Sequence, residues 1–178
     1  MRILYRVRQF WRNVTLKTDS YDLKRAQAQL NAEQWELFNR LQPAEKMHAM
    51  TVFHKLLEQG ENQPDLLTAA LLHDIGKLKY CLNPFQRAMV VVVSALMPQY
   101  AQRWGTSPTQ GWEALAGWRK AFVVAEQHAT WGAEMARQAG VSAMAEALIR
   151  QHHHPHGDEV GNDEDKLLHK LWIVDNDS

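Results

Sequence analysis

The balance between helix-forming and β-branched residues narrows the fold class of this chain. It holds 21 alanines and 20 leucines but only 12 valines and four isoleucines, and this favours helix over sheet. The β-branched run 90–93 has no second run with which to pair as a strand, so we interpret it as helical. A length of 178 residues suits one globular domain. We predict an all-α, compact bundle of roughly seven to eight helices.

Prolines, glycines and capping residues divide the chain into helical segments. We expect helices over 22–41, 44–59, 65–72, 82–104, 113–139, 142–154 and 166–174. The third helix, for which Asp65 is the expected N-cap, is apolar nearly all round and should be buried at the centre. The fourth should bend or break at Pro98. The acidic stretch 155–165 is interpreted as a mobile loop.

Charge and cysteine content limit the partners and the compartment. Lysines and arginines equal aspartates and glutamates at 20 each, which argues against a protein that coats a nucleic-acid polymer. The single cysteine, Cys81, cannot form an internal disulfide, so a reducing compartment fits. The longest strongly apolar stretch, 88–97, is too short to span a membrane, and the N-terminus lacks the apolar core of a signal peptide. We expect a cytoplasmic protein with no transmembrane segment.

Residues 1–20 differ from the rest of the chain and are expected to form a separate basic, amphipathic segment before a domain over 21–178. Up to residue 17 the segment carries five basic residues and no acidic one, with apolar residues at helical spacing between them. We favour a helix that docks on the domain. The alternative is contact with a membrane surface through 1–17.

The motif Leu-Leu-His-Asp-Ile-Gly-Lys, residues 71–77, carries the clearest chemical signal. His73 and Asp74 stand at the polar end of an apolar helix, where burying them unpaired would be costly. A bound cation removes that cost, and a carboxylate can bridge two cations. Gly76 leaves room beside them, and Lys77 lies three residues after Asp74, so it projects toward the same place. By itself such a pair is more often a structural hydrogen bond than a metal site.

Further candidate ligands strengthen the case for a metal site. They lie far apart in the sequence, on other expected helices or directly after one: His48, His128, His152, His153 and Asp175. A site rich in imidazole suits Fe, Mn, Zn, Co or Ni better than Mg. His54 shares a helix with His48, and periodicity alone does not choose between them.

The order of these residues resembles that of the HD-domain metal-dependent phosphohydrolases in their dinuclear form. The resemblance covers about residues 40–178 and includes the HDIGK string intact. It implies that one metal is held by His48, His73, Asp74 and Asp175. It also implies that Asp74 bridges to a second metal held by His128 and His152. His153 is either a further ligand of that metal or a substrate contact.

The resemblance implies in-line hydrolysis of a phosphate ester or anhydride in a small nucleotide-like substrate, without a covalent intermediate. Two metals would share a hydroxide that attacks phosphorus. Asp74 and Lys77 are the expected catalytic residues, and Lys77 would stabilise charge on a phosphate oxygen.

The chain also differs from the pattern of the family that it resembles. The HD-GYP branch, which cleaves cyclic di-GMP, carries Gly-Tyr-Pro where residues 154–158 read His-Pro-His-Gly-Asp, so we do not favour that substrate. An insertion at 80–127 is expected to shape the substrate pocket or a contact between two copies in a homodimer.

Two other functions stay open. One is a regulatory HD domain that binds metal and nucleotide without turnover. The other is a di-iron oxygenase, which the lack of paired Glu-x-x-His motifs disfavours.

Overall fold

The computed structural model describes residues 20–106, 111–153 and 161–178, and in these ranges the chain is all-α without a strand. The helices are α2 (Ser20–Gln29), α3 (Ala32–Arg40), α4 (Pro43–Glu58), α5 (Pro64–Leu72), α6 (Pro84–Leu96), α7 (Pro98–Gly105), α8 (Gly117–Gln138), α9 (Ala143–Gln151) and α10 (Asp163–Asn176), with 3₁₀ turns η1 (Ile75–Lys79) and η2 (Trp112–Ala114). The predicted fold class is confirmed. The basic segment before Ser20 and most of the loop from 155 lie outside the described residues.

Two of the expected helices are each divided in two. The expected break at Pro98 is confirmed, because α6 ends before it and α7 begins on it. The helix expected over 22–41 is wrong as a single element, since Asn31 starts a new helix there. The side chain of Asn31 accepts the Gln34 backbone N–H at 2.9 Å, and the Gln34 side chain accepts the Asn31 N–H at 3.1 Å. This reciprocal capping box stabilises a helix start in the middle of a helical pattern.

Some expected helix ends are also corrected. Asp65 is not the N-cap of α5: Gln63 accepts the Leu66 N–H at 2.8 Å, and Pro64 takes the first helical position. The last helix begins at Asp163 rather than at 166, because Asn162 caps it. Its acidic first turn, expected to be loop, is favoured there by the positive end of the helix dipole. The helix expected from 113 begins at Gly117, after η2.

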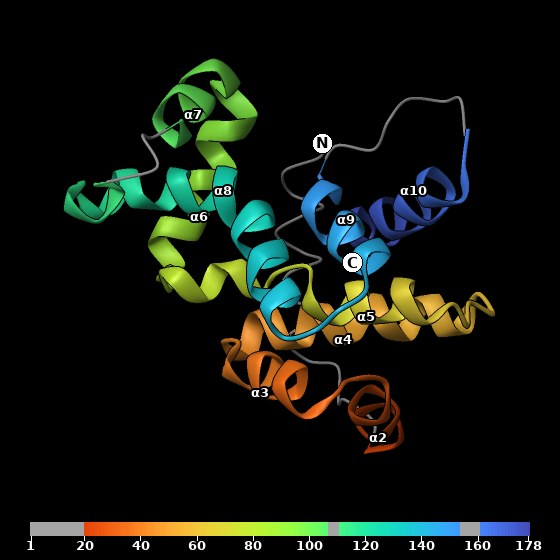
Figure 1. The fold of residues 1–178 in the computed structure, drawn as a ribbon. Coiled ribbons are helices and arrows are strands. Elements are labelled where there is room, and N and C mark those ends of the chain that lie inside the picture. The colour runs from red at the N-terminus through yellow and green to blue at the C-terminus, as the bar shows by residue number, and fades with distance from the viewer. Residues whose placement is uncertain (1–19, 107–110, 154–160) are drawn as a thin grey trace.

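Helix α5 is the centre of the core, as predicted. All of its residues from 66 to 72 are buried. Figure 1 shows α2 and α3 on one side of the α4–α5 pair, and α9 and α10 on the other. The end of α5 therefore lies where α4, α8, α9 and α10 can all reach it.

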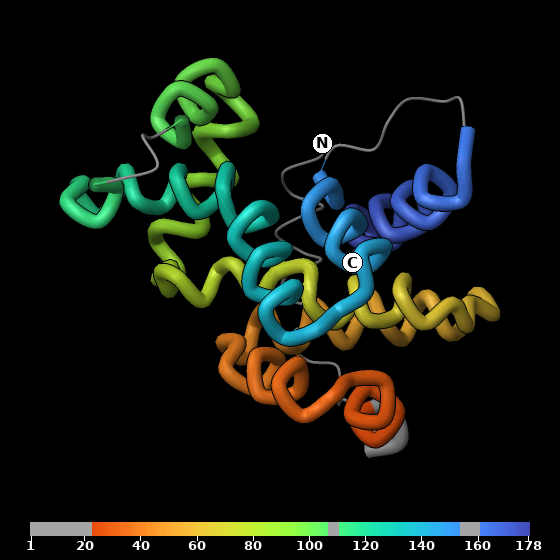
Figure 2. Tube along the Cα trace, viewed as in Figure 1, coloured from red at the N-terminus to blue at the C-terminus, as the bar shows by residue number. Residues whose placement is uncertain are grey.

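Helices α6 and α7 stand apart from this core. They pack mainly on each other and on the first part of α8 (Figures 1 and 2). The β-branched run 90–93 lies within α6, as expected. No helix among the described residues is both long and apolar enough to cross a membrane.

Candidate metal centre

All seven predicted ligands converge at the end of α5. His48 comes from α4 and Asp175 from the last turn of α10, while His73 is the C-cap of α5 and Asp74 the N-cap of η1. The three remaining histidines are His128 of α8 and, at the end of α9, His152 and His153. The ends of α5, α9 and α10 that meet here are carboxyl ends, which carry partial negative charge and favour a cation.

One group of ligands consists of His48, His73 and Asp74, whose ligand atoms lie within 4.8 Å of one another. Asp175 adjoins them. Its Oδ1 lies 2.7 Å from Nε2 of His48 and 3.4 Å from Nε2 of His73. We call these four residues the first group.

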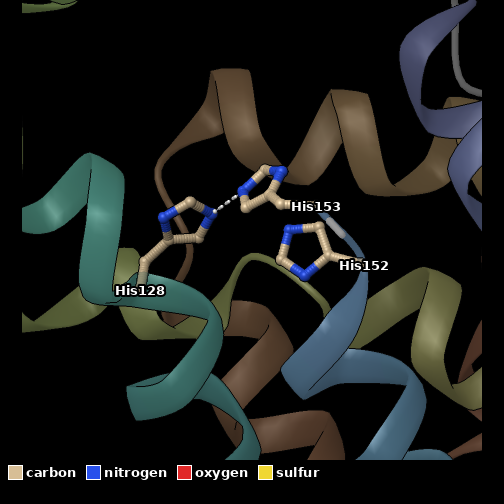
Figure 3. Close-up of side chains that lie close together, drawn as sticks. All are labelled: His128, His152 and His153. Carbon is tan, nitrogen blue, oxygen red and sulfur yellow. Dashed lines mark hydrogen bonds between the residues drawn. The ribbon is translucent and has the colours of Figure 1, made fainter. Parts of the chain in front are cut away.

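The second group consists of His128, His152 and His153, whose ligand nitrogens also lie within 4.8 Å of one another. Figure 3 shows His128 reaching in from α8 toward the two histidines at the end of α9. Nε2 of His128 lies 2.9 Å from Nε2 of His153. His153 thus lies among the candidate ligands, whichever of its two expected roles applies.

Asp74 connects the two groups through its two oxygens. Its Oδ2 lies 3.6 Å from Nε2 of His73 in the first group, and its Oδ1 lies 3.4 Å from Nε2 of His128 in the second. The side chain is buried. This is the arrangement of a carboxylate that can bridge two cations.

The buried imidazoles are oriented by the backbone so that Nε2 faces the centre. In each, Nδ1–H donates to a carbonyl of its own helix: His73 to Ala70 at 2.9 Å, His128 to Val124 at 2.9 Å and His152 to Ile149 at 2.7 Å. A carbonyl can only accept, so the neutral ring keeps its lone pair on Nε2. Fixing one ring nitrogen in this way prepares the other to ligate a metal.

Two of these nitrogens have no aligned hydrogen-bond partner among the described residues. They are Nε2 of His73 and Nε2 of His152, both buried. A buried polar atom left in this state costs free energy unless something binds it. The donor separations of 2.7–3.6 Å in the two groups fit ligands that share an ion at about 2.1 Å. The residues therefore fit transition-metal cations.

In the metal-free protein, the first group combines the ionised carboxylates of Asp74 and Asp175 with a protonated His73. Burial alone would lower the pKa of His73, but Asp74 and Asp175 outweigh it and raise the pKa to about 9. Burial also opposes ionisation of the two carboxyls, yet Lys77 and His73 hold the pKa of Asp74 well below its usual range, and His73 and His48 do the same for Asp175. A positive charge is thus already favoured at this position.

Two members of the second group, His152 and His153, are neutral at pH 7. Burial, together with the nearby His73, lowers the pKa of His152 well below its ordinary value. His153 keeps an exposed edge but packs on the His152 ring, with 3.9 Å between centroids. Partial burial and the neighbouring His128 lower its pKa to about 4. Neutral imidazoles can bind a metal without first losing a proton.

Lys77 projects toward Asp74, as its spacing in the sequence predicts. Its Nζ donates to Oδ2 of Asp74 at 2.7 Å, and the side chain is 31% exposed. The ammonium group therefore lies between the candidate bridging carboxylate and solvent.

Gly76 and Gly132 allow η1 and α8 to approach closely enough to bring the groups together. A Cβ at Gly76 would lie 1.9 Å from the backbone oxygen of His128, which is impossible without moving a helix. A Cβ at Gly132 would lie 3.2 Å from the Gly76 nitrogen. The room predicted beside His73 and Asp74 is thus occupied by the backbone of α8.

The sequence did not reveal Glu45, a buried carboxylate one turn before His48. It pairs with Arg87 of α6, which also bonds Gln42, and its Oε2 has no hydrogen-bond partner among the described residues. A glutamate in a first helical turn ordinarily indicates only a helix start, and the single Glu-x-x-His sequence formed by Glu45 and His48 does not predict a pairing with Arg87. His54, on the same helix as His48, is half-exposed beside Glu58 at 3.2 Å, which agrees with the choice of His48 as the ligand.

The chain was compared with protein-family models, curated proteins and solved structures, and none of them matches it.

Proposed function

We propose that this protein is a metal-dependent phosphohydrolase of the HD-domain type. Its substrate is a phosphate ester or anhydride of a small nucleotide-like compound. The observation that carries the proposal is the buried carboxylate of Asp74, whose two oxygens face two separate groups of ligand atoms. Paired metal positions about a shared carboxylate suit the hydrolysis of phosphate compounds.

The proposed ligands divide between two cations. His48, His73 and Asp175 hold one, His128, His152 and His153 hold the other, and Asp74 bridges them. Imidazole-rich surroundings favour Fe, Mn, Zn, Co or Ni, with Mg a weaker fit. Such cations supply an activated water as nucleophile and neutralise charge that builds on the phosphate.

The exposure of the side chains supports a direction for substrate entry. His73, Asp74, His128 and His152 form a buried floor, whereas His48 and Lys77 are 27% and 31% exposed and His153 is exposed. Lys77 is therefore the lysine at the exposed edge of the site, beside Asp74. The ammonium would bind a phosphate oxygen and stabilise its negative charge during hydrolysis, and Asp74 would hold the cations as their shared ligand.

The test uses full-length protein without a histidine tag, so that added histidines cannot bind metal. We expect elemental analysis to find about two transition metals per chain. We also expect protein loaded with Mn or Fe to hydrolyse at least one of a phosphomonoester, a phosphodiester or a dinucleotide polyphosphate. Asp74→Ala should lose nearly all bound metal and activity, because both groups lose their shared ligand.

His54→Ala is the matched control, since it removes an imidazole from the same helix as His48 but outside the site. It should keep both metals and full activity. Two bound metals without turnover of any of the three substrate types would refute the enzyme and leave a regulatory metal-binding domain. Unchanged metal content in Asp74→Ala would refute the site itself.

A further inference from the structure

Helix α6 exposes an apolar stripe that nothing in the described residues covers. Phe85 is 77% exposed, Val92 43% and Leu96 67%. With the half-buried Met89 they follow one another at intervals of four, three and four residues. We call these four residues the α6 seam. Its spacing is that of the a and d positions along which two helices pack together.

The side of α6 next to the seam, which carries Gln86 and Arg87, is attached to the molecule, and this fixes the exposed position of the seam. The Gln86 side chain is buried and donates to the Tyr80 hydroxyl at 3.1 Å and to the Gly117 carbonyl at 2.9 Å. Arg87 donates from Nε to the Leu82 carbonyl at 3.1 Å and pairs with Glu45. A helix held in this way cannot rotate to bury the seam against its own domain.

The exposed apolar surface extends beyond the seam. Seven of the nine large apolar side chains that are exposed in the described part of the chain belong to α6, the α6–α7 junction, α7 or the start of α8: Phe85, Val91, Val92, Leu96, Met97, Tyr100 and Trp118. At 41–77% exposure they present on the order of 700 Å². One partner in a standard protein interface contributes roughly 800 Å².

The occupant that fits this surface is a second copy of the chain. Residues 88–102 contain no charged residue, so two copies related by a two-fold axis meet without burying a charge or opposing like charges. A narrow seam also suits a partner helix, and Ala88 and Ala95, exposed beside it, permit close approach.

Two other occupants fit less well. Residues 1–17 carry five basic residues and no acidic one, and they would find no carboxylate over 88–102 to pair with. A lipid surface attracts helices whose polar face is rich in lysine and arginine, but this stretch has neither.

We propose that the protein forms a symmetric homodimer through the α6 seam and the neighbouring part of α7.

The proposal does not depend on the phosphohydrolase activity and is tested by mass in solution. Full-length protein is examined by sedimentation equilibrium from about 1 to 100 µM. We expect a mass twice the 20.5 kDa of one chain. Leu96→Glu places a charge in the seam and should halve the mass, while far-UV circular dichroism stays unchanged because the side chain is already exposed in the monomer. Phe85→Lys should act in the same way.

Leu23→Glu is the matched control, since Leu23 is 41% exposed on α2, away from the seam. This variant should remain a dimer. A wild-type monomer throughout the concentration range, or a dimer that survives both seam substitutions, would overturn the proposal. So would a monomer that sediments with phosphatidylcholine–phosphatidylserine vesicles and loses that binding in Leu96→Glu, because the seam would then be a lipid contact.

Discussion

Gly76 has no Cβ, and any other residue at this position would bring its Cβ into the backbone of α8. We expect Gly76→Ala to lower the free energy of unfolding by about 2 kcal/mol or more, because α8 must move away from η1. The same movement draws His128 from Asp74, so metal bound by the second group should fall while metal in the first is kept. Urea unfolding and elemental analysis measure both effects.

Gly117→Ala provides the comparison at a helical glycine with space. Its Cβ would come no closer than 3.4 Å to another group, the Tyr80 hydroxyl. This variant should keep its metal and its stability. A Gly76→Ala protein as stable and as metal-rich as Gly117→Ala would contradict the close helix crossing.

Protonation of individual histidines should make the two metal positions respond differently to pH. The pKa of His73 is raised to about 9, so below that pH a metal must displace its proton. Affinity of the first group should therefore fall about tenfold for each pH unit between pH 8.5 and 6.5. His153, whose pKa is lowered to about 4, and His152, also lowered, are neutral across this range, so neither of them adds a pH dependence to metal binding by the second group.

Competition titrations of Zn or Mn against chelators of known affinity measure these two constants. The variant His128→Ala leaves the first group to be titrated alone. Equal pH slopes at both positions would contradict the assignment of the proton to His73.

Between elements, the pairing of Arg87 on α6 with the buried Glu45 on α4 should be sensitive to the removal of one partner. Glu45 is 5% exposed, and Arg87→Ala leaves its charge buried without a partner. We expect this variant to lose about 3 kcal/mol of unfolding free energy. The double variant Glu45→Leu/Arg87→Leu removes both charges and should be clearly more stable than Arg87→Ala. Denaturant unfolding of both proteins checks this, and a double variant that is no more stable would mean that lost packing, not charge, dominates.

The elements also show which parts of the fold could be predicted from the sequence. The buried α5 and the break at Pro98 follow from local composition, so both were expected. The sequence did not predict the division of the helix at Asn31, because the pattern of apolar residues continues through it. The side-chain hydrogen bonds of the capping box end one helix and start the next there. The site ligands were predictable as residue types, but which oxygen of Asp74 faces which group depends on how α8 crosses η1. The buried Glu45 gives no sequence signal, since its partner lies 42 residues away.

In the whole molecule, the candidate metal centre brings together helices that lie far apart along the chain. His48 and Asp175 are 127 residues apart yet lie 2.7 Å from each other. Cations bound only by the folded chain stabilise it by about 2.7 kcal/mol at a hundredfold excess over the dissociation constant. For a chain of this size, that raises the thermal midpoint by roughly 5–10 °C.

We therefore expect chelation to lower the midpoint by that amount and added Mn or Zn to restore it, as followed by circular dichroism at 222 nm. Asp74→Ala should not respond to metal, because the residue shared by both groups is gone, whereas His54→Ala should respond as the parent does. An equal metal-induced rise in Asp74→Ala would mean that the cations bind elsewhere. In that case the convergence of α4, α5, α8, α9 and α10 would be a structural junction rather than a metal centre.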